Sequence, residues 1–240
     1  MSDQLNIWPR EDGKSIFNIS IPRYLEETYW WAYIHPNAVN FFERQWVVNL
    51  ILLGNFAKLR DAALDEFGDE IHSRVLQVAC VYGDFSVKIA ERLTGPGSLD
   101  IVDVLPMQLE NVRRKIPSRA PVHLFQGDSS SLNFPDSSYE RVILFFLLHE
   151  MPGPVREKTL REAYRVLKPG GKLVITEYHR PSRWNPLRYL YPLMFRMLEP
   201  FALETWARDF GGWFGREFEP VNVKKETFFG GLYQKVVITK

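Results

Sequence analysis

The chain has 240 residues, of which 45% are hydrophobic and 25% charged, and its formal net charge is +1. This size and composition are typical of one globular α/β domain with an added segment, and the near-neutral charge excludes a global field that attracts nucleic acid. The single cysteine, Cys80, excludes an internal disulfide framework and favours a reducing compartment. The polar N-terminus lacks a basic start followed by an apolar run, so we expect no secretory signal.

The N-terminal part, residues 1–72, is expected to form a helical cap. Its longest apolar run, Val47–Leu53, is far shorter than the ~20 residues that a membrane-spanning helix needs. Residues 22–56 around it have apolar positions at helical spacing and predict amphipathic helices. Aromatic residues beside arginines are also typical of helices that lie on a membrane surface. Two interpretations stay open: a cap that only packs on the core, and a cap that also contacts lipid.

From residue 73 onward, short β-like runs alternate with helix-like segments. The predicted strands are 74–79, 99–104, 122–126, 141–148 and 172–176, and the predicted helices are 85–93, 109–115 and 154–167. The run 141–148 is continuously apolar, as in a central parallel strand that helices cover on both faces. Two further strands, 223–228 and 233–239, flank two glycines and predict an antiparallel pair. The fold class is therefore α/β, a Rossmann-like, doubly wound and mostly parallel sheet with an antiparallel C-terminal strand over residues 73–240.

In such sheets the ligand lies outside the carboxyl ends of the strands, near the point where the strand order reverses. Asp103, followed by Val104, ends the second strand, where an acid can accept the ribose hydroxyls of a nucleoside; the alternative is a helix cap or a solvated turn. Asp128 and Ser129 follow the third strand, where a carboxylate can accept from an adenine amino group; the alternative is an Asx turn. The strand ends therefore predict a nucleoside pocket.

Four segments resemble the class I S-adenosylmethionine (AdoMet) methyltransferases. They are residues 75–86 (VLQVACVYGDFS), 103–109 (DVLPMQL), 126–140 (QGDSSSLNFPDSSYE) and 163–177 (AYRVLKPGGKLVITE). Within that superfamily the segments are similar to the quinone C-methyltransferases of ubiquinone and menaquinone biosynthesis. The resemblance covers about residues 73–180 and implies AdoMet as the cofactor.

The first of these segments departs from the methyltransferase pattern of an acidic residue followed by a Gly-x-Gly turn. Gln77 stands at the acidic position, and three residues with side chains precede the one retained glycine, Gly83. Glycines in such a turn let the backbone approach the ligand, so these side chains are expected to displace the methionine part of AdoMet or to reshape its pocket. A pseudoenzyme is one interpretation of this loss. The expected cofactor-binding residues are Gln77, Ala79, Cys80, Val81, Tyr82, Gly83, Asp103, Val104, Asp128 and Ser129.

A second resemblance involves the N-terminal run. Residues 24–46 (YLEETYWWAYIHPNAVNFFERQW), together with 78–84 (VACVYGD), are similar to the rhodoquinone-biosynthesis enzymes, over about residues 21–210. The resemblance implies conversion of ubiquinone to rhodoquinone, in which an amino group replaces a methoxy group, with AdoMet as amino donor and manganese required. A neutral Gln77 fits such chemistry, because without a nearby carboxylate the methionine amine loses its proton more easily and becomes nucleophilic.

Manganese prefers oxygen ligands and accepts imidazole. The candidate ligands follow the fourth and fifth predicted strands and are His149, Glu150, Glu177 and His179. The candidate catalytic residues are His149, Glu177 and Tyr178. A histidine at position 149 and an acid at position 177 also match ordinary methyltransferases, so a role shared with those enzymes stays open.

Substrate and partners follow from the aromatic segments. The insertion at about 180–215 is expected to bind the quinone, and the cap (22–56) with residues 184–201 to form the access route for its prenyl tail. Five arginines are expected to meet lipid head groups: Arg23, Arg44, Arg183, Arg188 and Arg196. We therefore expect ubiquinone as a lipid substrate, peripheral association with the cytoplasmic face of the inner membrane, and no nucleic-acid partner. Two alternatives stay open: a methyltransferase that acts on a prenylated quinone, and a non-catalytic subunit that binds AdoMet or quinone.

Overall fold

The computed structural model describes residues 7–8, 20–29, 36–207, 210–214 and 222–240. Residues 30–35 of the N-terminal resemblance and parts of the predicted 180–215 insertion lie outside these ranges. Within the described residues, no helix is both long and apolar enough to cross a bilayer.

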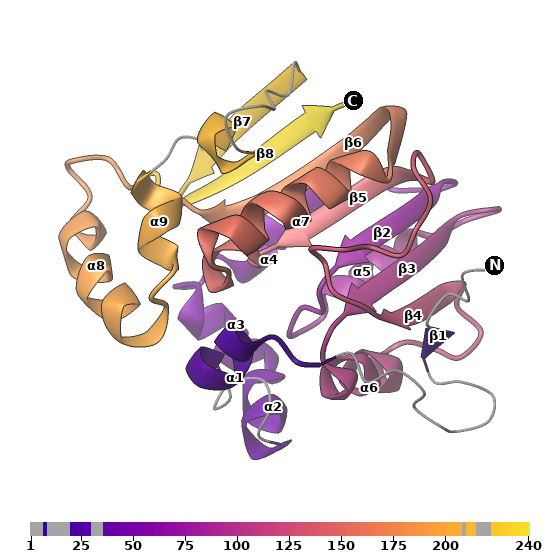
Figure 1. The fold of residues 1–240 in the computed structure, drawn as a ribbon, viewed down its shortest axis with the longest axis horizontal. Helices are drawn as coiled ribbons and strands as arrows, with labels where there is room; N and C mark the ends of the chain where they lie inside the picture. The colour runs from indigo at the N-terminus through magenta and orange to yellow at the C-terminus, as the bar shows by residue number, and fades with distance from the viewer. Residues whose placement is uncertain (1–6, 9–19, 30–35, 208–209, 215–221) are drawn as a thin grey trace.

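A mixed sheet runs through the centre of the molecule, in the order β1-β4-β3-β2-β5-β6-β8-β7 (Figure 1). The strands are β1 (Ile7–Trp8), β2 (Arg74–Val78), β3 (Ser98–Asp103), β4 (Val122–Gln126), β5 (Tyr139–Phe145), β6 (Leu167–Tyr178), β7 (Asn222–Phe228) and β8 (Tyr233–Thr239). Strands β4, β3, β2, β5 and β6 are parallel, and β8 is antiparallel to both of its neighbours, β6 and β7. The predicted doubly wound sheet with an antiparallel C-terminal strand is confirmed. Its order reverses between β2 and β5, where such folds bind ligands.

Helices cover both faces of the sheet. They are α1 (Arg23–Tyr29), α2 (Pro36–Phe42), α3 (Gln45–Ile51), α4 (Phe56–Leu64), α5 (Phe85–Arg92), α6 (Pro106–Lys115), α7 (Gly153–Arg165), α8 (Leu187–Leu198) and α9 (Ala202–Ala207), with 3-10 turns η2 (Leu148–Glu150) and η3 (Phe210–Trp213). Phe56, Phe85 and Leu109, of α4, α5 and α6, belong to the apolar cluster on one face, and Leu160 of α7 belongs to the cluster on the other. Burial on both faces explains why the central strands read as continuous apolar runs.

Several predicted elements differ from the observed ones at their ends; the strand predicted over 172–176, for example, extends over Leu167–Tyr178 as β6. The strand predicted over 141–148 ends at Phe145, because Phe146 has a left-handed backbone (φ 53°) and residues 148–150 form the turn η2. The carboxylate of Glu177 accepts the N–H groups of Leu148 and His149, at 2.9 and 3.1 Å, and so takes the place of a strand partner for this segment. The helix predicted over 109–115 begins earlier, at Pro106, a residue preorganised for the first helical position.

Polar contacts join the N-terminal helices to the sheet domain. Glu43, just before α3, forms an ion pair with Lys115 at 2.7 Å and accepts a hydrogen bond from Asn111 at 2.6 Å. Arg60 of α4 donates to both carboxylate oxygens of Asp84, at 2.8 and 2.6 Å. Figure 1 shows α1, α3, α8 and α9 grouped at one end of the sheet, which places the cap over the carboxyl ends of the parallel strands.

Candidate functional site

A cavity of about 750 Å³ lies at the carboxyl ends of β2, β3, β4, β5 and β6, under the cap. Eleven of the predicted site residues line it: Ala79, Cys80, Val81, Tyr82, Asp103, Val104, Asp128, Ser129, His149, Glu150 and Tyr178. Four others, Gln77, Gly83, Glu177 and His179, are not on its wall. The strand ends therefore bring most of the predicted residues together around one space.

Asp103 is the buried acid at one end of this cavity. Its Oδ2 accepts the N–H of Cys80 at 2.7 Å, and its Oδ1 accepts the N–H of Leu105 at 2.8 Å. Burial raises the pKa of the carboxyl, although these backbone donors act in the opposite direction. The side chain thus joins the end of β3 to the turn after β2 and also faces the cavity.

Asp128 and Ser129 lie beside Asp103 on the cavity wall. The Oδ1 atom of Asp128 accepts the N–H of Ser130 at 2.8 Å, so the Asx turn that was the alternative interpretation is present. Ser129 is within hydrogen-bond distance of Thr159, at 3.0 Å. The turn fixes Asp128 at the cavity and leaves its second oxygen available for a ligand.

The turn after β2 keeps a glycine-like backbone without the glycines. Ala79 has φ 68°, the left-handed region that costs a residue with a Cβ about 1–2 kcal/mol. Gln77 stabilises this turn through two hydrogen bonds of 2.9 Å. Its Nε2 donates to the Ala79 carbonyl, and its Oε1 accepts from the Ser86 hydroxyl. Both polar atoms of the Gln77 amide therefore form a hydrogen bond inside the protein.

The retained glycine contacts the cap. A Cβ on Gly83 would lie 2.7 Å from Oε1 of Gln45, the first residue of α3. The same Gln45 oxygen accepts the N–H of Asp84 at 3.2 Å, and Lys115 donates to the Gly83 carbonyl at 2.8 Å. Gly83 does not line the cavity; its positive φ of 80° accounts for a glycine at this position, and Gln45 of α3 packs against it.

Tyr82 occupies the space beside the turn. Its hydroxyl accepts a hydrogen bond from Gln108 of α6 at 2.7 Å, and its ring stacks on Phe42 of the cap with centroids 6.1 Å apart. All three residues line the cavity. The Tyr82 side chain thus closes the cavity on the side of α2.

His149, on the cavity wall, forms a buried ion pair with Glu177, which is not on the wall. Nδ1 of His149 lies 2.9 Å from Oε1 of Glu177. Burial lowers the pKa of His149, but the surrounding carboxylates outweigh it, Glu177 most, and raise the pKa to about 9. The Tyr178 ring meets the imidazole edge to face, with centroids 4.9 Å apart. His149 is therefore an imidazolium at neutral pH, held in one orientation from two sides.

Two further carboxylates face the outer side of this imidazole. Oε1 of Glu150 and Oε2 of Glu199 each lie 4.0 Å from its Nε2. Glu199 follows α8, and burial raises its pKa; Tyr29 of α1 is near enough to bond with it. Glu150 and Glu199 both line the cavity.

The four candidate manganese ligands do not form a metal site, although His149 lies near both Glu177 and Glu150. Oε2 of Glu177 accepts two backbone N–H groups, and Oε1 accepts the N–H of Tyr178 and faces His149. His179 is turned to the Gly231 carbonyl, 2.7 Å from its Nδ1. Among the residues that the structure describes, no group of three His, Cys, Asp or Glu side chains lies close enough to hold a metal ion. The donors present do not fit manganese, because those of Glu177 and His179 are already bonded within the protein.

Sequence reasoning missed three residues of this site. Tyr24 of α1 lines the cavity, and burial, together with Glu150, Asp128 and Asp103, raises its pKa. Glu199 and Gln45 reach the site from α8 and α3. Tyr24 and Gln45 lie within the run 24–46 that carries the second resemblance, but the sequence alone does not assign them to the site, since all three side chains arrive through the packing of segments far apart in the sequence.

Comparison with known proteins gives the family. The family model described as a methyltransferase domain matches residues 75–171. A demethylmenaquinone methyltransferase from Thermus thermophilus is 30% identical over 68% of this chain and 73% of its own length. The chain belongs to the class I methyltransferase-like superfamily. Another demethylmenaquinone methyltransferase, from Bacillus licheniformis, is 28% identical over 64% of this chain.

Solved structures show the same fold. A protein from Pyrococcus horikoshii (PH0226) has a TM-score of 0.55 at 16% identity, covering 92% of this chain and 99% of that one. A SAM-dependent methyltransferase from Aquifex aeolicus has a TM-score of 0.52 at 17% identity, with 85% and 97% covered. This methyltransferase-like chain spans about 65% of the length of the Bacillus relative. The activity and the substrate of the whole protein are therefore proposals.

Proposed function

We propose that this chain is an AdoMet-dependent transferase that acts on a neutral quinone with a prenyl tail. The observation that carries the proposal is a cavity with two chemically different ends. One end is acidic and lies at the strand ends where this superfamily binds its cofactor; the other is apolar and lies between the cap and α8. One cavity therefore has room for a cationic cofactor and an apolar substrate side by side.

The acidic end suits AdoMet, which carries a sulfonium charge. Asp103 and Asp128 line it, and Glu150 and Glu199 line the adjoining wall. Among the described residues on the cavity wall none is Lys or Arg. Such a wall favours a cation and disfavours phosphorylated ligands. Asp103 would accept the ribose hydroxyls, and Asp128 would accept from the adenine amino group.

The apolar end suits a prenylated ring. Val48 and Leu52 of the cap and Tyr191, Met194 and Leu198 of α8 line it. Burying such a tail is favoured by about 25 cal/mol per Å² of apolar surface. These five side chains carry no charge, so an uncharged substrate is preferred at this end.

His149 is the polar group that can act on the substrate ring. When bound, AdoMet supplies an electrophilic methyl group. Glu177, as a positioning residue, holds the imidazole through Nδ1, so that Nε2 carries a proton toward the cavity. A quinone or quinol oxygen placed there would accept that proton as a hydrogen bond, and Glu150 or Glu199 would take up a proton released from the ring.

Among the candidate reactions, methyl transfer has the better support from relatives, because the two relatives described above are named demethylmenaquinone methyltransferases. The test is incubation with AdoMet labelled in its methyl group and with demethylmenaquinol, the reduced form whose unsubstituted ring carbon can attack the methyl group and then lose a proton; ubiquinone is incubated in parallel as the substrate for amination. Label in the quinone, together with S-adenosylhomocysteine formation, is the expected result. AdoMet binding without any turnover of either quinone would support the non-catalytic subunit instead.

Amination of ubiquinone to rhodoquinone is the second candidate. The altered turn of Gln77, Ala79 and Val81 favours it, because the usual methyltransferase turn is not kept. Gln77 bonds to Ala79 and Ser86 and does not line the cavity, so any effect of this residue on the methionine amine would be indirect. The manganese that the resemblance implies has no ligand group among the described residues.

A second label separates the two candidates. AdoMet that carries heavy nitrogen in its amino group is incubated with ubiquinone, with and without added manganese. Heavy nitrogen in the quinone, with loss of one methoxy group, identifies amination. Methyl label in demethylmenaquinol, with no heavy nitrogen in ubiquinone, identifies methyl transfer, because every ring position of ubiquinone is already substituted. Activity without added metal, in protein freed of metal by chelation, would exclude a manganese requirement.

A further inference from the structure

Two helices expose apolar faces at the mouth of the cavity. On α8, Tyr189, Leu193 and Met197 are exposed, Met197 by 76%. On α3, Trp46 and Leu50 are exposed, Leu50 by 65%. Isolated apolar side chains are normal on a protein surface, whereas a contiguous set of this size marks a binding surface.

Both faces continue the apolar wall of the cavity. Leu190 and Leu198 of α8 line the cavity and are also solvent-exposed, as are Leu50 and Ile51 of α3. On both helices, therefore, apolar side chains extend from the cavity wall to the outside. Figure 1 shows these two helices at the same end of the sheet.

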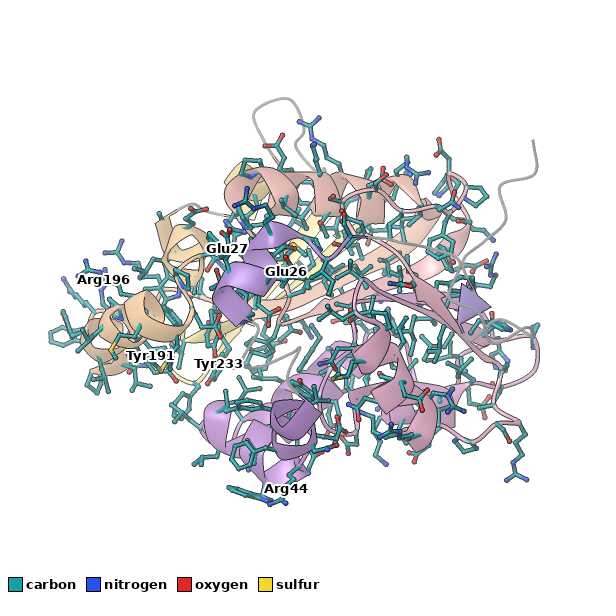
Figure 2. The ribbon with its side chains drawn as sticks, turned by 60° about the horizontal axis from the view of Figure 1, so that its bottom comes forward. Glu26, Glu27, Arg44, Tyr191, Arg196 and Tyr233 are labelled. Carbon is teal, nitrogen blue, oxygen red and sulfur yellow. The ribbon has the colours of Figure 1, made fainter. Side chains whose placement is uncertain are left out.

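The charges around this surface are basic. Residues 182–198 include no Asp or Glu, and the arginines Arg183 and Arg196 are exposed there. Arg183 lies over the ring of Trp184, 5.0 Å from its centroid, and Trp184 is 82% exposed. Figure 2 shows Arg196 projecting outward from α8 and Arg44 from the edge of the cap.

Helix α1 is not part of this surface. It exposes Glu26 and Glu27, labelled in Figure 2, and Glu27 forms an ion pair with Arg23 at 2.9 Å. Glu27 therefore competes with anionic head groups for Arg23, which was expected to contact lipid. The side chains that make up this surface lie on α3 with the preceding Arg44, in the segment 182–186 and on α8.

We infer that α3 and α8 form a docking surface for an anionic lipid bilayer, with the cavity mouth facing the lipid. Exposed Leu, Met and Trp side chains would enter the boundary between head groups and acyl chains, and Arg44, Arg183 and Arg196 would meet the anionic head groups. A second copy of this chain does not account for the arginines, because two such basic faces would repel each other. The surface is independent of which group the enzyme transfers, since it rests on exposure and charge alone.

Vesicle sedimentation tests this surface. The full chain is mixed with vesicles of phosphatidylcholine alone or with added phosphatidylglycerol, at low salt and at about 0.5 M salt, where charges are screened beyond roughly 4 Å. We expect binding to the anionic vesicles, weakened but not abolished by salt because the apolar contribution persists. Absence of sedimentation with anionic vesicles at low salt would overturn the proposal.

Two matched variants locate the surface. Leu193→Glu with Met197→Glu adds two negative charges on the exposed face of α8, at positions that do not line the cavity. Val223→Glu with Lys224→Gln changes the charge equally on the exposed strand β7. The α8 variant should bind vesicles roughly tenfold more weakly and the β7 variant like wild type. Equal losses in both variants would overturn the location.

Two control measurements accompany these variants. S-adenosylhomocysteine binding and the thermal midpoint of both variants should match wild type, which shows that the fold and the cofactor end are unchanged. Light scattering after gel filtration reports the oligomeric state. A dimer that the α8 variant dissociates, together with no vesicle binding by wild type, would reassign the surface to contact between copies. Vesicle binding with no quinone turnover would contradict only the proposed function and would still support the docking surface.

Discussion

The carboxylate of Glu177 serves two purposes for His149: it forms an ion pair with the ring Nδ1 at 2.9 Å and accepts the backbone N–H of the same residue at 3.1 Å. One buried acid on β6 thereby fixes both the turn after β5 and the orientation of the imidazole. Glu177 therefore shapes the site even though its side chain is not on the cavity wall.

The raised pKa of His149 predicts a loss of stability at alkaline pH. The value of about 9 lies above the ordinary histidine value, so the folded state binds the proton more tightly. The resulting stability is fully present below about pH 6.5 and is lost as the pH rises through about 9. Urea unfolding should show wild type losing about 2 kcal/mol more than His149→Gln between these limits. Parallel pH curves for the two proteins would contradict the ion pair.

Asp103 predicts the strength of cofactor binding. Asp103→Asn removes the charge and one acceptor at the acidic end, so S-adenosylhomocysteine should bind roughly tenfold more weakly, a loss of about 1–3 kcal/mol. Titration calorimetry measures the affinity, and thermal melting shows whether the turn at Cys80 survives. Asp136→Asn, at an exposed ion pair with Arg165, makes the same charge change away from the cavity and should leave the affinity unchanged. Equal affinity in all three proteins would remove the nucleoside assignment.

The sequence was sufficient for the sheet because burial on both faces produces strong local patterns. The bounds of 122–126 and 233–239 agree with β4 and β8. It was not sufficient for the end of β5, since that end depends on a side chain 29 residues away in the sequence, Glu177 reaching Leu148. The local spacing of apolar residues does not predict such a long-range contact.

The same limit applied to the site. Asp103 and Asp128 were placed correctly on the cavity, because their position follows from where strands end. The contact between Gly83 and Gln45 was not foreseen, and Glu199 was not identified at all. Both depend on how α3 and α8 pack over the sheet, and amphipathic helices of similar composition can dock in many ways.

The left-handed backbone of Ala79 predicts the effect of substitution there. Ala79→Gly relieves the strain at φ 68° but gives the unfolded chain more freedom, so the free energy of unfolding should change by less than about 1 kcal/mol. Ala79→Val adds a branched side chain in the same conformation and should cost more than about 2 kcal/mol. Guanidinium unfolding of both variants measures the difference. A valine variant as stable as the glycine variant would mean that the turn can relax.

Gln77 gives the last prediction, because two roles for its amide lead to opposite results. In the structure it is 1% exposed, donates to the Ala79 carbonyl and accepts from the Ser86 hydroxyl. Gln77→Glu keeps the length but loses the donor, leaving a carboxylate against a carbonyl oxygen. We expect it to reduce the free energy of unfolding by about 1–3 kcal/mol and to weaken S-adenosylhomocysteine binding in proportion. Ser86→Ala, which removes one of the two bonds, should show a smaller loss in the same direction.

The alternative role, in which a neutral residue 77 keeps the AdoMet amine nucleophilic, predicts another pattern for the same variant and for Gln77→Asp. AdoMet would bind as well as or better than in wild type, because the new carboxylate pairs with the ammonium, whose pKa it raises. Nitrogen transfer to ubiquinone would then be lost at neutral pH and recover as the pH rises, since only the free base can attack. Transfer rates between about pH 6.5 and 9.5, with unfolding and binding measured on the same samples, separate the two roles. Wild-type stability and affinity in both variants would rule out the structural role, and a rate that simply follows affinity at every pH would rule out the chemical one.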